Sequence, residues 1–323
     1  MKHIIIGIHG LSNKPSKKTL RRWWLRSIRE GLKSIGQARV KIPFELVYWA
    51  DIIYTAPQTQ KVRDKSHPLF LKEPYAKSIL QPQPEHSPIR IKMMKYFEAQ
   101  LDKILLNEDM TVNFKGITDH IIHRFAQDLE LYYGEYATSP LNPTHTIKEA
   151  IQNRLIQTIK SYRGYKILLI AHSMGSIVAF DVLWTLNNGQ PIHRFITLGS
   201  PLGLPVITAR VFADQKAVQD TIGKPHAPEC VAEQWLNMSD IRDKVALDHT
   251  LADDYAPNTK GISAQDFIVH NDYSFKGRPN EHKSYGYLRT PEIATAIDDF
   301  LSETLKNRVL RLIKRVLRAK LTY

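Results

Sequence analysis

Cysteine is nearly absent from this chain, since Cys230 is the single cysteine among 323 residues. A lone cysteine excludes an intramolecular disulfide and a metal site built from several cysteines. Long apolar runs are also missing, because no stretch approaches the roughly 20 residues that a helix needs to cross a bilayer. The N-terminus lacks the pattern of a secretory signal, since a β-branched run follows Met1-Lys2-His3 directly and no small-residue cleavage site comes after it. We therefore expect a cytoplasmic protein.

Acidic residues are too few to balance the basic ones, and the formal net charge is +13. Two blocks carry the excess: residues 14–33 contain eight basic residues and one acidic residue, and residues 303–323 contain seven and one. A basic protein often binds nucleic acid. No nucleic-acid-binding motif accompanies these blocks, so we do not expect a nucleic-acid partner.

The second basic block has the pattern of an amphipathic helix over about 305–321, with apolar residues on one side and cations on the other. Such a helix is typical of a protein that binds an anionic membrane surface or a partner. It would place the protein peripherally at the inner membrane surface. A terminal helix that docks on the body and leaves its basic face in solvent fits the pattern equally well.

Apolar patterning predicts strands that alternate with helices in two parts of the chain, 1–50 and 146–305. This alternation is typical of a mostly parallel sheet with helices on both faces. The strands are expected at 3–8, 44–49, 167–170, 194–199, 234–238 and 265–270, and the helices at about 16–35, 146–162, 175–187 and 291–305.

Residues 51–145 interrupt this alternation. Six prolines between residues 57 and 88 exclude long regular elements there, and two helices with apolar periodicity follow at about 93–105 and 117–129. We predict a core of 1–50 and 146–305, a helical cap or lid over 51–145, and a basic amphipathic C-terminal helix over 306–323. The cap would lie over a substrate site at the carboxyl edge of the sheet and form its acyl-binding wall. Alternatively, its helices would simply extend the core.

Ser173 lies between a buried strand and a helix, in the segment Ala171-His172-Ser173-Met174-Gly175. A nucleophilic serine on such a sharp turn needs small neighbours two residues away on each side, because larger side chains would collide with adjacent elements. Ala171 and Gly175 meet this requirement. The following helix directs its first N–H groups and its dipole toward a developing negative charge. The pattern therefore predicts a nucleophile at Ser173.

This segment, together with a first strand that ends in His9-Gly10-Leu11, resembles bacterial lipases and esterases of the α/β-hydrolase superfamily. The resemblance implies an oxyanion hole made by the backbone N–H groups of Leu11 and Met174, with His9 shaping the loop. It also implies that His172 is not the base, and we expect this residue to pack or to hydrogen-bond locally. Alanine at position 171, where many relatives have glycine, is the one departure.

In this superfamily the acid and then the histidine follow the nucleophile along the chain. Asp243 precedes an apolar anchor in a turn after the predicted strand 234–238, and Asp240 is the alternative. His282 lies in a polar loop before the last core helix, and His270, at the end of a strand, is its rival. Further acidic alternatives are Asp248, Asp253 and Asp254.

The sequence therefore predicts a serine hydrolase that acts on carboxylic esters through Ser173, His282 and Asp243, without a metal or an organic cofactor. The expected substrate is a small-molecule or lipid acyl ester. The same residues would serve a thioesterase or an amidase. A protein of this fold that binds a lipid or a partner without catalysis is the alternative from another class.

Overall fold

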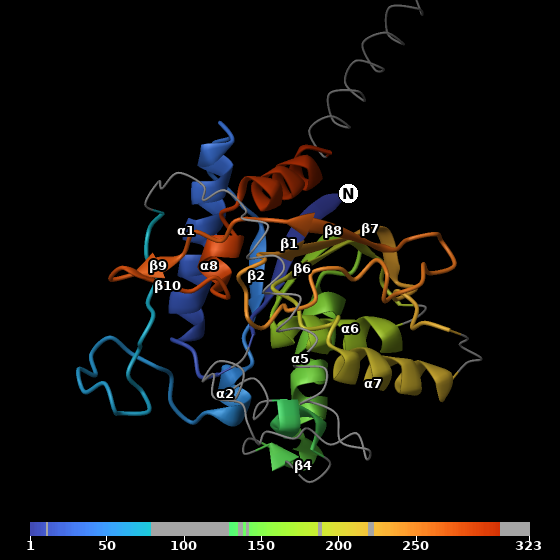
Figure 1. The fold of residues 1–323 in the computed structure, drawn as a ribbon, viewed down its shortest axis with the longest axis horizontal. Coiled ribbons are helices and arrows are strands. Elements are labelled where there is room, and N and C mark those ends of the chain that lie inside the picture. Colours follow the sequence, from blue (N-terminus) through green and yellow to red (C-terminus); the bar gives the residue numbers. More distant parts are fainter. Residues whose placement is uncertain are drawn as a thin grey trace, which may run out of the picture.

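The computed structural model describes residues 1–10, 12–78, 129–134, 138–139, 142–186, 189–218 and 223–303 (Figure 1). A six-stranded sheet with the order β2-β1-β5-β6-β7-β8 forms its centre, and every neighbouring pair is parallel. The predicted fold class is thereby confirmed. The strands are β1 (Lys2–Ile8), β2 (Phe44–Val47), β5 (Tyr165–His172), β6 (Ile192–Leu198), β7 (Val231–Ser239) and β8 (Ala264–Ile268).

Helices cover both faces of the sheet (Figure 1). Alternate residues of a strand point to opposite faces, so Ile5 of β1 packs with one group of helices and Ile4 and Ile6 pack with the other. The Ile5 face is covered by α1 (Lys17–Ser34), the short α8 (Ser284–Tyr287) and a helix over 291–303. The opposite face is covered by α5 (Ile147–Ser161), α6 (Met174–Thr185) and α7 (Pro205–Lys216).

Helix α1 packs closely against β1. A Cβ atom at Gly7 would lie 2.7 Å from the Trp24 ring, so only glycine lets this helix approach the strand. The helix ends at Ser34, and Gly36 follows with a φ of 76°, a conformation that glycine adopts at little cost.

The predicted cap region starts with α2 (Ala50–Ile53). The chain up to residue 78 then crosses the face that carries α1 and α8. There Tyr273 donates a hydrogen bond to the Pro74 carbonyl at 2.6 Å, and Arg289 donates one to the Ala76 carbonyl at 2.7 Å. Farther along the chain, Leu129 and Tyr132 are buried in the core beside α5 and α6.

Two short strand pairs were not expected from the sequence. Two antiparallel pairs are formed by β3 (Thr138–Ser139) with β4 (Asn142–Thr146) and by β9 (Ser274–Phe275) with β10 (Arg278–Pro279). The helices predicted at 93–105 and 117–129 fall almost entirely, and the C-terminal helix over 306–323 entirely, outside the described residues. Among the described helices, none combines the length and apolarity needed to cross a membrane.

Candidate active site

Ser173 occupies the turn between β5 and α6, with φ 56° and ψ −133°. This region of backbone conformation costs a non-glycine residue on the order of 1–3 kcal/mol. Two glycines leave room for the turn. A Cβ atom at Gly175 would lie 2.7 Å from the His9 carbonyl oxygen, and one at Gly10 would lie 2.6 Å from the Ser173 Cβ. The small residue at position 175 is therefore required by the close approach of the first strand.

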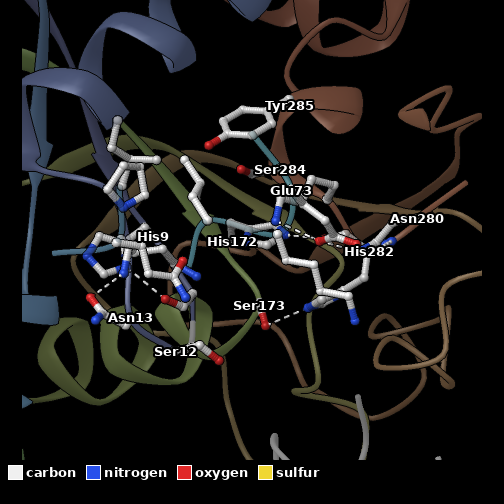
Figure 2. Close-up of a pocket in the computed structure, with 18 of the residues that line it drawn as sticks. His9, Ser12, Asn13, Glu73, His172, Ser173, Asn280, His282, Ser284 and Tyr285 are labelled. Atoms are coloured by element: carbon white, nitrogen blue, oxygen red, sulfur yellow. Dashed lines mark hydrogen bonds and ion pairs between the residues drawn. The ribbon is translucent and has the colours of Figure 1, made fainter. Parts of the chain in front are cut away.

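Three side chains from three loops form a continuous chain of hydrogen bonds. The Ser173 Oγ lies 2.8 Å from His282 Nε2, and His282 Nδ1 lies 2.9 Å from both carboxylate oxygens of Asp243. Figure 2 shows the Ser173 hydroxyl directed toward the His282 ring. Because an ionised carboxylate only accepts, Nδ1 carries the proton and Nε2 is left to accept from the serine hydroxyl. The structure thus brings together the three residues that the sequence singled out.

The Asp243 carboxylate is fully buried. Burial alone would raise its pKa, but the charge and hydrogen bond of His282, the Val245 N–H and the Tyr287 hydroxyl outweigh burial and lower the pKa. The Val245 N–H donates to Oδ1 at 2.9 Å, and the Tyr287 hydroxyl donates to Oδ2 at 2.7 Å. Gly199 makes room, because a Cβ atom there would lie 2.6 Å from Oδ2. The carboxylate is therefore held ionised in one orientation.

The alternative acid and base lie in a different cluster, organised by Arg242. Asp240 accepts hydrogen bonds from Arg242 Nε at 2.9 Å and from the Asn271 N–H at 2.7 Å. The same guanidinium lies 2.8 Å from His270 Nδ1. Asp240 and His270 therefore contact Arg242. In contrast, His282 contacts both Ser173 and Asp243.

His172 forms a long-range contact instead of the local one we expected. Its Nε2 donates to the backbone carbonyl of His282 at 2.7 Å, across 110 positions of sequence, and the two rings lie 5.0 Å apart. Burial, with a smaller contribution from the nearby His282, lowers the pKa of His172 well below its usual value. The neutral ring thus ties the nucleophile turn to the loop that carries His282.

His9 is also held neutral, because burial lowers its pKa to about 3. The Trp49 N–H donates to His9 Nε2 at 3.0 Å, which leaves Nδ1 to donate to the Gly10 carbonyl at 2.7 Å. The ring also stacks on Trp49 at 4.8 Å. These contacts fix the backbone just before the predicted oxyanion loop.

Of the two predicted oxyanion donors, Met174 lies within the described residues and Leu11 does not. Met174 is the first residue of α6, so its N–H belongs to the first turn of the helix, where no intrahelical carbonyl is available. Leu11 lies outside the described residues, and its part in the oxyanion hole stays a prediction.

A cavity of about 220 Å³ opens beside Ser173. One part of its wall is apolar and contains Leu20, Trp24, Leu71 and Tyr285; another part is polar and contains Asn13, Lys14, Lys72 and Glu73.

Glu73 connects this wall to the loop that carries His282. Its carboxylate accepts from Asn280 Nδ2 at 2.9 Å and pairs with Lys283 Nζ at 2.9 Å. These two residues flank His282 in sequence, so part of the predicted cap region both lines the cavity and holds the histidine loop.

The described residues contain no group of three or more His, Cys, Asp or Glu side chains that could hold a metal ion. Cys230 is buried, and burial raises the pKa of its thiol to about 12. The thiol donates to the Leu183 carbonyl at 3.1 Å. Cys230 is thus a core residue, as its isolation in the sequence indicates.

Sequence reasoning missed two residues that support the site, Tyr287 and Glu73. Tyr287 lies five residues after His282, and no local pattern separates it from a core tyrosine. Glu73 lies in a proline-rich stretch where periodicity gives no signal. Only the tertiary arrangement reveals these two contacts.

Comparison with known proteins agrees with the fold. A family model described as the PGAP1-like alpha/beta domain matches residues 106–283, more than half of the chain. No curated protein matches the chain. The matched range includes Ser173, Asp243 and His282, although β1, α1 and β2 precede it. The chain belongs to the PGAP1-like alpha/beta family, which is of the α/β-hydrolase type.

Proposed function

We propose that this protein is a serine esterase that cleaves carboxylic acyl esters through Ser173, His282 and Asp243. The observation that carries the proposal is the 2.8 Å approach of the Ser173 hydroxyl to His282 Nε2, with the buried Asp243 carboxylate on the other side of the ring. Nucleophile, base and orienting acid in this geometry form the arrangement used for acyl transfer.

The reaction follows from the proton positions. Ser173 Oγ attacks the acyl carbon while His282 Nε2 takes the hydroxyl proton, and Asp243 stabilises the imidazolium that forms. The imidazolium then gives its proton to the departing alcohol, which leaves an acyl group on Ser173. A water molecule, deprotonated by His282, attacks this acyl group, and the carboxylic acid and the free serine are released.

Negative charge on the substrate oxygen requires donors close to Ser173. The Met174 N–H is one proposed donor, because it lies at the start of α6, where the helix dipole favours an anion. The Leu11 N–H is the second proposed donor. Loss of one such donor typically lowers kcat about 10²- to 10³-fold.

The cavity supports a substrate with two unlike parts. Leu20, Trp24 and Leu71 offer an apolar surface for the acyl chain, and Asn13, Lys14 and Lys72 offer a polar surface for the alcohol. Residues 71–73 come from the segment predicted as a cap, and we propose that this segment forms part of the substrate wall. A small-molecule or lipid acyl ester satisfies both halves of the cavity.

The test is labelling with a fluorophosphonate probe together with hydrolysis of p-nitrophenyl acetate. The Ser173→Ala variant should lose labelling, and its kcat/KM should fall at least about 10³-fold. Ser161→Ala serves as the matched control, because Ser161 is an exposed serine at the end of α5. Labelling of a folded Ser173→Ala protein at the wild-type level would show that another residue is the nucleophile. A wild-type protein that neither takes the label nor hydrolyses the ester would leave a non-catalytic binding role.

The leaving group is tested separately. An ester, a thioester and an anilide with the same acyl group should be compared on the wild-type protein. A clear preference in kcat/KM for the ester supports the esterase. Preference for the thioester or the anilide would favour a thioesterase or an amidase that uses the same three residues.

A further inference from the structure

Helix α1 carries a straight row of cations on its outer side. Lys18, Arg22, Arg26, Arg29 and Lys33 are all exposed. With about 100° of rotation and 1.5 Å of rise per residue, these five positions fall within an arc of about 80° and extend over about 22 Å. We call these five residues the α1 row.

Acidic neighbours do not neutralise the α1 row. Glu30, the one acid in the helix, accepts a hydrogen bond from Tyr75 and lies 3.4 Å from Arg289. Arg26 stacks on the Tyr75 ring at 4.6 Å. Within the described part of the chain, no carboxylate forms an ion pair with Lys18, Arg22, Arg29 or Lys33.

The other cations of α1 contrast with the row because they have structural partners. Lys17 pairs with Glu45 at 3.0 Å, and Arg21 donates to the Phe44 carbonyl at 2.7 Å. The fold therefore uses Lys17 and Arg21 to fasten α1 to β2, and it does not use the α1 row in this way.

The row also works against the stability of the helix. Like charges three or four residues apart on a helix repel each other, and α1 is already anchored by Leu20, Trp24 and Ile28 on its buried side. Five exposed cations, four of which form no ion pair within the described residues, indicate a surface that meets an anionic ligand.

We infer that the α1 row docks this protein onto an anionic lipid surface. The choice of lipid rests on the proposed function, since an acyl-ester substrate is commonly held in a bilayer. The five side chains are exposed and share one side of the helix, so they can approach a flat anionic surface together. The row contains no apolar side chain that would insert, so the attraction is electrostatic. Leu20 and Trp24 of the same helix line the cavity, which therefore lies beside the docked helix.

The test is co-sedimentation of the full chain with phosphatidylcholine vesicles that contain or lack phosphatidylserine. Each cation near an anionic surface strengthens binding about fivefold. A Lys18→Gln/Arg22→Gln/Lys33→Gln variant should therefore bind the anionic vesicles about 100-fold more weakly. Binding of the wild type should weaken as salt is added, because ions screen the surface.

The matched control is Lys160→Gln/Arg163→Gln/Lys216→Gln, which removes the same charges from exposed positions on α5, its following turn and the end of α7. These helices lie on the opposite face of the sheet. Near-normal vesicle binding by this control, together with the loss in the row variant, supports the inference. Equal loss in both variants, or none in either, overturns it.

Nucleic acid is the other anionic surface that the row could meet. Fluorescence anisotropy with a duplex oligonucleotide tests it on the same variants. Row-dependent binding to the duplex without binding to vesicles would overturn the lipid assignment. Thermal melting checks that each variant is folded. Hydrolysis of p-nitrophenyl acetate by the row variant reports on the proposed esterase separately from docking.

Discussion

The ring of His172 donates a hydrogen bond to the backbone carbonyl of His282 at 2.7 Å. The residue directly before the proposed nucleophile thus holds the backbone of the proposed base. The two loops meet at this bond, and the same geometry sets the distance between Ser173 Oγ and His282 Nε2. His172 is therefore a positioning residue in the proposed mechanism.

The His172→Ala variant should lower kcat about 10- to 100-fold with little change in KM, because a misplacement of about 1 Å at a reacting group costs up to 10²-fold. His172→Gln keeps a side-chain N–H at a similar reach and should recover part of kcat. Steady-state kinetics on a soluble ester measures both variants. A rise in KM with unchanged kcat would instead place His172 in substrate binding.

Substitution of Asp243 and substitution of Asp240 should have different effects on kcat and on stability. Asp243→Asn should lower kcat about 10³- to 10⁴-fold with little loss of stability, because the amide cannot stabilise the imidazolium and favours the wrong tautomer of the base. Asp240→Asn should keep kcat within about tenfold and lower the free energy of unfolding by about 3 kcal/mol, since it removes the buried carboxylate that Arg242 contacts most closely and leaves Glu281, at 3.7 Å, as the next one. Kinetics and urea unfolding of both variants test this pair, and the reverse pattern would make Asp240 the acid.

The two histidines provide a parallel test. His282→Ala should be nearly as inactive as Ser173→Ala, whereas His270→Ala should retain most of the activity, because His270 contacts Arg242. Ester hydrolysis by the two purified variants decides the matter. An inactive His270→Ala protein beside an active His282→Ala protein would reverse the assignment of the base.

Tyr287→Phe removes one hydroxyl from the interior. This hydroxyl donates to Asp243 Oδ2 at 2.7 Å and accepts from the Asp240 N–H at 3.0 Å. The buried Asp240 N–H would lose its acceptor, and Asp243 Oδ2 would keep His282 Nδ1 but lose a second donor. The free energy of unfolding should therefore fall by about 2 kcal/mol, and kcat should also fall. Tyr165→Phe, at the start of β5, is the control and should change neither quantity. Wild-type values for Tyr287→Phe would show that the contact is dispensable.

Buried neutral histidines should make the protein sensitive to acid. The pKa of His9 is about 3 in the folded state and near 6.5 when unfolded. Below pH 6.5 the unfolded chain therefore binds the extra proton, and stability falls as the pH drops, by about 2 kcal/mol between pH 7 and pH 5. His172 acts in the same direction. Asp243, with its lowered pKa, adds a further loss only below about pH 4.

Urea unfolding at pH 7 and pH 5 measures this slope. His9→Gln should be less stable at pH 7 but should lose about 2 kcal/mol less on acidification than the wild type. The exposed His67→Gln variant serves as the control and should keep the wild-type slope. An unchanged slope in His9→Gln would mean that His9 is already charged in the folded protein.

Much of the fold could be predicted because apolar periodicity in the sequence indicates the strands of the sheet. Strand β5 and helix α6 adjoin in sequence, so the turn at Ser173 followed from local rules about small neighbours. Asp243 and His282 were chosen by chain order and loop position. The structure places His282 beside Ser173 and Asp243 beside His282, although their catalytic roles stay predictions. The helix α7 and the contact of His172 with His282 were not predicted, because the packing that produces them joins residues far apart in sequence.

The hydrogen bond and the ion pair of Glu73 restrict which changes in the cavity wall the proposed active site can tolerate. In many enzymes a loop that shapes the pocket can be exchanged without disturbing the reacting groups. Here the residue that contributes to the wall also holds Asn280 and Lys283 on either side of His282. A segment transplanted into 71–78 from a known esterase would have to supply a carboxylate at the same place. In the proposed esterase, a change of this wall should therefore alter substrate preference and turnover together.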